Sequence, residues 1–362
     1  MAPYLIIFAI LSFYSLKDLY KKSKFLEGEF YISGTIILLL MGLRENIGCD
    51  WKSYNLIFEE VSHPILDEKY ISSFLELGFL YLNKAIFLIG GSFNSLIFIT
   101  SLLFLIPLMI FCKRQPLPFL ALTIAFPYFI VVVGMGFIRQ AIAISIILLS
   151  IIQFEESRPF RYFLSTSIAS LFHKTSLIFL FPGLFLFRNP DPAKRIRYIA
   201  AICIAISTIF FILLSNKFKI YDYFLIILNY YLNYKEIEDR SATGAIYFLL
   251  LNLVPSVLYL LKYKQISPNI NARIMWTILS YLSLASLPVL LLLKPTLTYR
   301  LSLYLIPIQI YVGSNLPDLK LFSLSKKVWT TIIIVYSFIT MYIWLSFANH
   351  ASCWVPYKSI LF

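Results

Sequence analysis

Charged residues are scarce in this sequence. Only 14% of its 362 residues are Asp, Glu, Lys or Arg, while 60% are hydrophobic. Soluble domains carry about 25% charged residues, and the mean hydropathy here is +0.81. Apolar runs follow one another along nearly the whole length, and no interval is long and polar enough for a separate soluble domain. The composition excludes an ordinary soluble protein and predicts an all-α integral membrane protein with a single polytopic domain over residues 1–362.

The sequence also lacks the short motifs of the common enzyme classes. It contains no GxxxxGKS/T loop, no GxGxxG opening a helix after a strand, no HExxH and no GxSxG. Its four cysteines are far apart and form no CxxC pair: Cys49, Cys112, Cys203 and Cys353. Nucleotide-driven coupling, zinc hydrolysis and serine-esterase chemistry therefore have no support. We expect no metal and no cofactor.

Basic residues outnumber acidic ones, with a formal net charge of +13. In membrane proteins Lys and Arg gather in the cytoplasmic loops, and no nucleic-acid-binding motif accompanies the charge. We therefore expect membrane lipids rather than nucleic acid as partners.

Ten apolar segments have nearly the length of a membrane-spanning helix. They lie near residues 2–16, 30–43, 94–112, 117–134, 137–153, 197–215, 244–262, 273–293, 299–316 and 328–347. Residues 160–187 are also apolar but carry His173 and Lys174 at their middle. A single crossing there would put the basic group 188–197 outside, against the positive-inside bias. We therefore predict two short helices, about 160–172 and 175–188, that turn at His173. The total is about twelve crossings with both termini outside.

Two outer segments are long, near residues 44–93 and 216–243. The first contains residues 70–90, an apolar stretch that carries Glu76 and Lys84. This stretch is either a spanning helix or an interfacial or re-entrant one. A crossing would upset the alternation of the loops, so we favour the interfacial or re-entrant alternative.

The first strongly polar run after the N-terminal helices is RENIGCDWKSY, residues 44–54. Arg44 closes the second helix, and Arg139, with Gln140 beside it, should open a helix after Gly134 and Gly136. Arg300, preceded by Tyr299, should have the same placement as Arg139. A helix N-terminus and an Arg fork both suit phosphate. The alternative is that each Arg only extends to the membrane interface.

Three further ionisable residues are candidates at this face. His173 at the helix break can act as a base or donor, or be satisfied by a backbone carbonyl. Glu76 and Asp50 are the candidate carboxylates. Asp50 can instead pair with Arg44, and Glu76 can simply face water. Cys49 and Cys353 both fall outside in this topology, so a disulfide between them is a further hypothesis.

The order of four motifs resembles a known family. They are RENIGCDWKSY, ELGFLYLN, FIRQAIA and LFHKTSL, spread over residues 44–177. The series resembles the EpsG-like family of bacterial polysaccharide polymerases, a Wzy-type group, over roughly residues 35–310.

The resemblance implies a metal-independent glycosyltransferase of the inner membrane with a GT-C-like architecture and a periplasmic site. Such enzymes transfer a glycan from undecaprenyl diphosphate onto the next lipid-linked repeat unit, and a chain-length regulator is a further expected partner. Matching motifs imply a site lined by six residues besides His173: Arg44, Asp50, Tyr54, Glu76, Arg139 and Gln140. Tyr299 and Arg300 join them as substrate-binding candidates on the topology argument. His173 and Glu76 are the catalytic candidates.

Two other classes stay open. A flippase or transporter of a lipid-linked oligosaccharide would also need Arg in the membrane, but transporters usually show internal repeats, and the sequence shows none. An O-acetyltransferase or single-sugar transferase would need a cytoplasmic or acyl-donor site, which the outer placement of the Arg and His residues disfavours.

Overall fold

The computed structural model describes residues 1–19, 26–62, 75–187, 242–267, 269–292, 295–319 and 324–361. Within these ranges the regular elements are helices, and the β pairing is one isolated bridge between Arg44 and Ser359. Three described helices are long and apolar enough to cross a membrane: α6 (Phe93–Lys113), α8 (Ile138–Glu155) and α17 (Lys326–Phe347). The chain is thus a helical membrane protein. The total of about twelve crossings and the GT-C-like architecture stay predictions.

The chain divides into two compact units. The first comprises Met1–Leu149, Leu171–Lys174 and Gln309–Phe362, and the second comprises Ser150–Ser170 and Thr175–Ile308. Nearly all predicted site residues belong to the first unit; Tyr299 and Arg300 belong to the second. The single polytopic domain stays a prediction.

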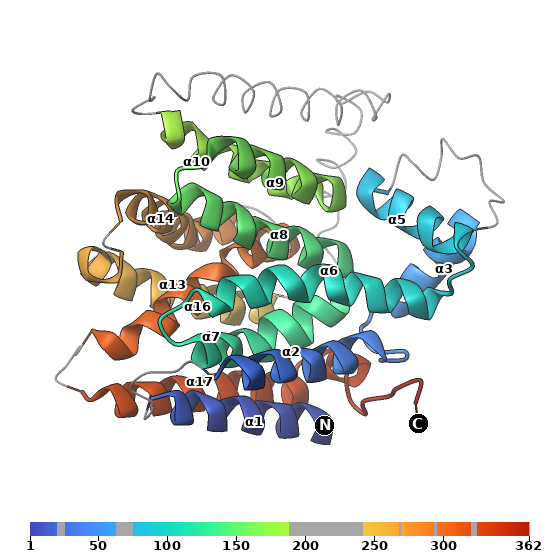
Figure 1. Cartoon of the computed structure of the whole chain (residues 1–362), viewed down its shortest axis with the longest axis horizontal. Coiled ribbons are helices and arrows are strands. Elements are labelled where there is room, and N and C mark those ends of the chain that lie inside the picture. Colours follow the sequence, from blue (N-terminus) through green and yellow to red (C-terminus); the bar gives the residue numbers. More distant parts are fainter. Residues whose placement is uncertain are drawn as a thin grey trace. The chain divides into compact units, whose positions relative to one another are not determined.

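The first unit is a bundle around a short helix that is buried almost all round. This helix, α7 (Pro118–Ala125), packs against α1 (Ala2–Asp18), α6 and α17, while α2 (Glu27–Gly42) packs along α6 (Figure 1). Almost every side chain of α7 is buried, as expected for a helix that is apolar on all faces. It is therefore the core element of this unit.

The helix α7 continues as a π-helix over Phe126–Gly134. Pro127 stands at its start and has no backbone N–H to donate, so the regular i to i−4 hydrogen bonding cannot continue there. A shift to π-type bonding accommodates this loss. The π-helix ends at Gly134, and Phe137 separates it from α8. The predicted break before Arg139 is confirmed.

Most predicted helices are present within the described residues. The predicted segment 197–215 and the outer segment 216–243 lie outside them. The sequence interpretation missed α3 (Trp51–Ser62). Within 70–90 the described helix is α5 (Leu77–Leu88), whose 12 residues extend about 18 Å. This is shorter than the hydrocarbon core of about 30 Å, which favours the interfacial or re-entrant alternative.

The predicted break at His173 is confirmed. Helix α9 (Pro159–Phe172) ends there, and a 3-10 helix (Lys174–Phe179), α10 (Leu180–Gly183) and a second 3-10 helix (Leu184–Phe187) follow. Within the second unit Tyr162 donates to the carbonyl oxygen of Phe179, and the rings of Phe163 and Phe187 stack at 5.8 Å. Both contacts join a residue before His173 to one after it, so the chain folds back on itself as a hairpin with His173 in its turn. Its return arm is mostly 3-10 rather than the predicted α-helix.

Further along the second unit, the described residues include α13 (Ala242–Ile266), α14 (Ile270–Leu292) and α15 (Pro295–Ser302), which pack on one another. The prediction of one helix over 299–316 is wrong. Helix α15 begins earlier, at Pro295, a residue suited to the first turn. A 3-10 turn (Leu303–Leu305) then separates it from α16 (Ile306–Asn315).

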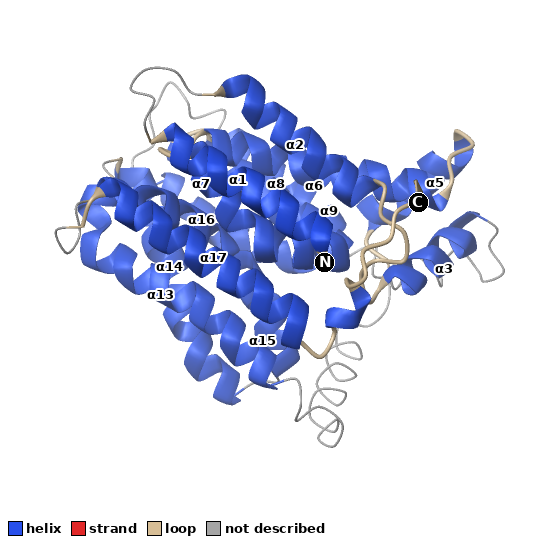
Figure 2. Cartoon of the chain, turned by 90° about the horizontal axis from the view of Figure 1, so that it is seen from below, coloured by secondary structure: helices blue, strands red, loops and turns tan. Residues whose placement is uncertain are grey.

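The C-terminal residues fold back over the loop that follows α2. We name residues 353–360 the C-terminal strap. Its backbone pairs with that loop: Glu45 N–H donates to Lys358 at 3.0 Å, and Ile360 N–H donates to Leu43 at 3.0 Å. Figure 2 shows the strap as irregular chain beside the end of α2. The predicted disulfide between Cys49 and Cys353 is present, with a Cα–Cα distance of 5.1 Å.

We expect the disulfide to stabilise the fold, because it joins residues separated by 304 positions. The loop-closure relation gives an upper value of roughly 5–6 kcal/mol, and embedded helices lower it by restricting the unfolded chain. Reductant should lower the melting temperature of the wild-type protein in detergent, followed by tryptophan fluorescence. The same reductant should leave the Cys49→Ser/Cys353→Ser double variant unchanged. Equal effects of reductant on both proteins would contradict this role.

Candidate functional site

Among the described residues of the first unit, Arg44 is the charged residue that is buried. It is only 1% exposed. Its guanidinium donates to the carbonyl oxygen of Met41, to Ser101 Oγ at 3.3 Å and to the carbonyl oxygen of Met135 at 3.3 Å. Burial lowers the pKa of Arg44 to about 10, so it is still charged at neutral pH. One cation thus joins the end of α2, α6 and the chain just before α8.

This geometry makes Arg44 a positioning residue. Its fork is occupied by protein oxygens, and Trp51 lies 5.8 Å from the guanidinium carbon, within the range of a cation–π contact. The Arg44 side chain is enclosed, so it does not extend to the membrane interface, which was the alternative interpretation. A direct contact between Arg44 and substrate stays a prediction.

The loop after Arg44 makes close backbone contacts at Gly48. Its φ is +99°, and a Cβ there would lie 2.6 Å from the carbonyl oxygen of Met135, which is closer than any real Cβ contact. Glycine fits because it tolerates positive φ and has no Cβ. Gly48 N–H also donates to the carbonyl oxygen of Cys353 at 2.9 Å. The loop is therefore held between the C-terminal strap and the chain that leads into α8.

Arg139 lies in the first turn of α8, as predicted, and forms an ion pair with Glu76. The Arg139 side chain is 28% exposed and that of Glu76 is 12% exposed. Glu76 is the residue before the first turn of α5, so the pair connects the starts of two helices. The alternative that Glu76 merely faces water is not the observed arrangement. Sequence spacing could not reveal the pair, because the partners are 63 positions apart.

Tyr54 completes this cluster from α3. Its side chain hydrogen-bonds with Arg139, and its ring meets that of Phe79 edge-on at 5.7 Å. Burial raises the pKa of Tyr54, and the charge of Arg139 opposes the rise. Tyr54 therefore stays a neutral phenol at neutral pH. We name Tyr54, Glu76 and Arg139 the Arg139 cluster.

His173 lies near this cluster by way of its hairpin. A Cβ built on Gly78, in the first turn of α5, would lie 2.8 Å from the carbonyl oxygen of Leu171. The end of α9 therefore contacts the start of α5, two residues from Glu76 and two from His173. Both contacting segments belong to the first unit. The structure thus brings four of the predicted residues into one region: Tyr54, Glu76, Arg139 and His173.

Asp50 and Gln140 flank the same region. Asp50 precedes α3, and its charge raises the pKa of Tyr54, so the two side chains are near each other. Gln140 follows Arg139 in α8 and is 3% exposed. Their predicted contacts with substrate stay predictions.

The placement predicted for Arg300 is wrong. Since α15 begins at Pro295, Arg300 lies in its last turn rather than in the first turn of a helix. Its position therefore differs from that of Arg139, which lies in the first turn of α8. Tyr299 meets Phe248 edge-on at 5.4 Å within the second unit. Substrate binding by Tyr299 and Arg300 stays a prediction.

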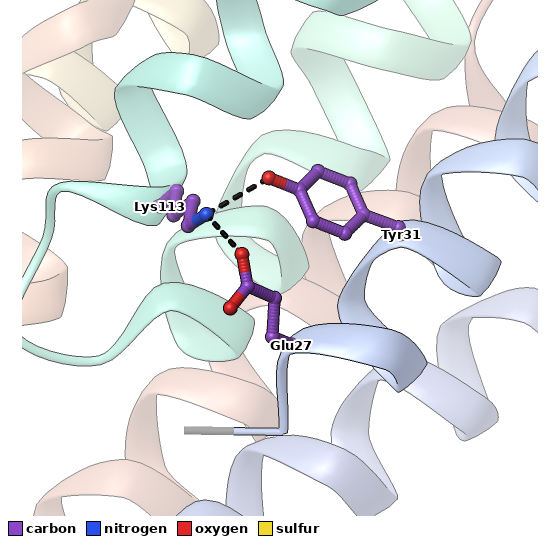
Figure 3. Close-up of polar contacts among 3 residues, drawn as sticks. All are labelled: Glu27, Tyr31 and Lys113. Atoms are coloured by element: carbon purple, nitrogen blue, oxygen red, sulfur yellow. Dashed lines mark hydrogen bonds and ion pairs between the residues drawn. The ribbon is translucent and has the colours of Figure 1, made fainter. Parts of the chain in front are cut away.

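A second ion pair provides a comparison for the Arg139 cluster. Lys113, at the end of α6, contacts Glu27 at 2.5 Å and Tyr31 at 2.8 Å (Figure 3). Its two charged side chains are 37% and 58% exposed. Like the Arg139 cluster, this group combines a basic side chain, a glutamate and a tyrosine, but it is exposed and lies at the start of α2, at the end away from Arg44. Solvent screening makes such exposed pairs weak.

Sequence reasoning missed the contribution of the C-terminal strap. Trp354 is 2% exposed and donates through Nε1 to the carbonyl oxygen of Val131 at 2.7 Å. Tyr4 donates to the carbonyl oxygen of Trp354 at 3.0 Å. The signal that could have found the strap is its composition, because a Trp next to a Cys after the last helix is unusual for a free tail.

Substitution of Gly48 tests how the loop is positioned. Gly48→Ala should destabilise the protein and reduce any activity of the site, because the Cβ meets the carbonyl oxygen of Met135. Gly90→Ala is the matched control, since Gly90 also has positive φ, +76°, but its Cβ meets nothing within 4 Å. Thermal melting should separate the two variants. Equal losses would show that backbone strain alone, and not the close approach, decides the effect.

Substitution of Arg44 tests its positioning role. Arg44→Lys keeps the charge but loses the planar fork, and each buried carbonyl left without a donor costs roughly 1–3 kcal/mol. We expect a clear loss of thermal stability, greater still in Arg44→Ala. Arg161→Lys, at an exposed position of α9, is the control and should melt like the wild type. An unchanged melting temperature in Arg44→Lys would contradict the role.

One of three comparisons with known proteins returns a match. The comparison with curated proteins returns no match, and the comparison with solved structures returns none either. The sequence model of the EpsG family matches residues 29–359. This match covers nearly the whole chain, including every residue of the Arg139 cluster and the C-terminal strap up to Ser359. The chain therefore belongs to the EpsG family.

Proposed function

We propose that this protein is a polysaccharide polymerase of the bacterial inner membrane. It transfers a glycan from a lipid diphosphate onto another lipid-linked repeat unit at the periplasmic face. Membership of the EpsG family supports a polysaccharide-related polymerase. The lipid carrier, the direction of transfer and the side of the membrane are part of the proposal.

The observation that carries the proposal is the Arg139 cluster. Arg139 opens α8, where free backbone N–H groups and the helix dipole favour an anion. The Arg139 side chain is 28% exposed, whereas Arg44 is enclosed at 1% exposed. Of these two guanidinium groups, that of Arg139 is the one a phosphate oxygen can reach.

The reaction requires stabilisation of a leaving diphosphate. As the glycosidic carbon leaves its phosphate oxygen, negative charge grows on the diphosphate, and a fixed guanidinium stabilises it. Glu76 and Tyr54 orient Arg139 before substrate binds, which removes the cost of ordering a long side chain. Arg44 acts one step further away, by fixing the chain that leads into α8.

The acceptor hydroxyl needs a group that accepts or orients its proton. His173 at the hairpin tip and Glu76 are the candidates. Glu76 already holds Arg139, so we assign proton acceptance to His173 and orientation of the cluster to Glu76. Asp50 and Gln140 border the region and are assigned to sugar or phosphate contacts.

The disulfide supports the assignment of this face to the periplasm. Disulfides persist in oxidising compartments and are rare in the cytosol. The disulfide joins Cys49, in the loop after α2, to Cys353, the first residue of the C-terminal strap. In the same loop Gly48 meets Met135, which precedes Arg139 in the chain leading into α8. The disulfide therefore lies near the Arg139 cluster, and we assign both to the periplasmic face.

Variants of the ion pair test the proposal. In a polymerase-null host, Arg139→Ala should abolish long glycan chains, and Arg139→Lys should retain little activity because Lys lacks the fork. Removal of one such donor costs roughly 10²–10³-fold in rate. The rate is measured with purified protein, as extension of a defined undecaprenyl-diphosphate repeat unit. The variants His173→Ala and Glu76→Gln are measured in the same series.

The exposed pair described above is the matched control. Glu27→Gln and Lys113→Ala remove the same charges at the opposite end of α2, and both variants should extend the repeat unit at the wild-type rate. Long chains made by a well-expressed Arg139→Ala variant would overturn the proposal. Lipid-linked single repeats trapped inside the null host, rather than outside, would support a flippase instead.

A further inference from the structure

The first unit contains an apolar groove at a distance from the Arg139 cluster. Its volume is about 420 Å³ and it is open along one side. Ala9, Phe13 and Tyr14 of α1 and Ile32, Ser33 and Ile36 of α2 line it. We name it the α1–α2 groove. Its volume lies within the roughly 300–1,000 Å³ range of ligand sites.

The walls of the groove are apolar and partly exposed. Phe13 and Ile32 are each 61% exposed. Ser33, the polar residue of the lining, is 3% exposed and donates to the carbonyl oxygen of Glu29 at 2.8 Å. Its hydroxyl is therefore satisfied within the helix. The groove offers a ligand van der Waals contact along its length.

Aromatic contacts connect both walls of the groove to α7. The ring of Tyr14 stacks on Phe119 of α7 at 5.0 Å, and Phe119 meets Phe30 of α2 edge-on at 5.4 Å. Phe119 is buried, so the three rings tie both walls to the core. Because the walls are already ordered, binding a flexible chain in this groove costs no conformational entropy of the walls.

A cation stands at one end of the groove. Lys17 Nζ lies 5.4 Å from the ring centre of Tyr14 and 5.9 Å from that of Phe13, both lining residues. These contacts hold the ammonium group over the aromatic wall. An ammonium group binds phosphate as a point charge. The groove therefore combines an apolar channel with a fixed positive charge at its mouth.

We propose that the α1–α2 groove binds an anionic phospholipid, with one acyl chain in the groove and the headgroup phosphate at Lys17. The charged mouth lies at the end of α1 and the start of α2, whereas the Arg139 cluster lies beyond the other end of α2. The 16 residues of α2 separate the two by about 24 Å. A lipid held here is distinct from the substrate of the proposed polymerase.

Native mass spectrometry of the purified full chain tests this proposal. The protein is titrated with phosphatidylglycerol and with phosphatidylcholine of the same acyl chains. We expect one phosphatidylglycerol to bind more tightly than phosphatidylcholine. Lys17→Gln should weaken that binding about fivefold, the usual contribution of one basic residue to binding an anionic lipid. Ala9→Phe should weaken binding of both lipids at this site, because the ring fills the groove.

Two matched controls accompany these variants. Lys264→Gln removes a lysine that also lies over a tyrosine ring, at 5.9 Å from Tyr263, and Ala2→Phe adds the same ring elsewhere on α1. Neither should change lipid binding. Equal retention of the two lipids, or unchanged binding in Lys17→Gln, would overturn the proposal. A dimer that Ala9→Phe disrupts while lipid binding is unchanged would show that a second copy of the chain covers the groove, and would overturn it too.

Discussion

The buried guanidinium of Arg44 is the interaction on which the first unit depends. It donates to a carbonyl at the end of α2, to Ser101 on α6 and to the carbonyl of Met135, just before α8. A buried charge is costly unless its donors find partners. Here the partners come from three separate segments, so moving any one of them leaves a charged donor unsatisfied. Burial of the Arg44 charge therefore favours the one arrangement of these segments in which its donors have partners.

The C-terminal strap reinforces the same junction from the outside. Trp354 reaches a carbonyl of the π-helix, Gly48 sits against Met135, and the disulfide closes the loop after α2 onto the strap. The start of α8 is thus held from inside by Arg44 and from outside by the strap. Arg139 lies in the first turn of α8, next to this junction, and Glu76 and Tyr54 orient its guanidinium. Preorganised charge of this kind is what stabilisation of a leaving diphosphate requires.

Much of the fold follows from hydropathy, and the misses have physical causes. The helices around residues 2–18, 93–113 and 326–347 are long apolar runs whose ends carry polar residues. The break at His173 follows from the positive-inside bias. Helix α3 was missed because its mixture of polar and apolar residues is amphipathic rather than continuously apolar. The start of α15 was missed because its first turn, PTLTYR, is polar and resembles a loop. Segments such as 197–215 lie outside the described residues, so their predictions stay open.

The sequence by itself determined that this is a helical membrane protein, which residues are chemically capable, and which family their order resembles. It could do so because membrane insertion selects long apolar runs and makes each ionisable exception informative. Only the tertiary structure decided which of these residues are partners. In it Arg44 donates hydrogen bonds to backbone carbonyls, Arg139 contacts Glu76 and Tyr54, and the turn of the hairpin lies beside the start of α5. Most of these pairings join residues tens of positions apart, 91 for Arg44 and Met135 and 63 for Arg139 and Glu76, and no local pattern encodes a contact that only packing creates.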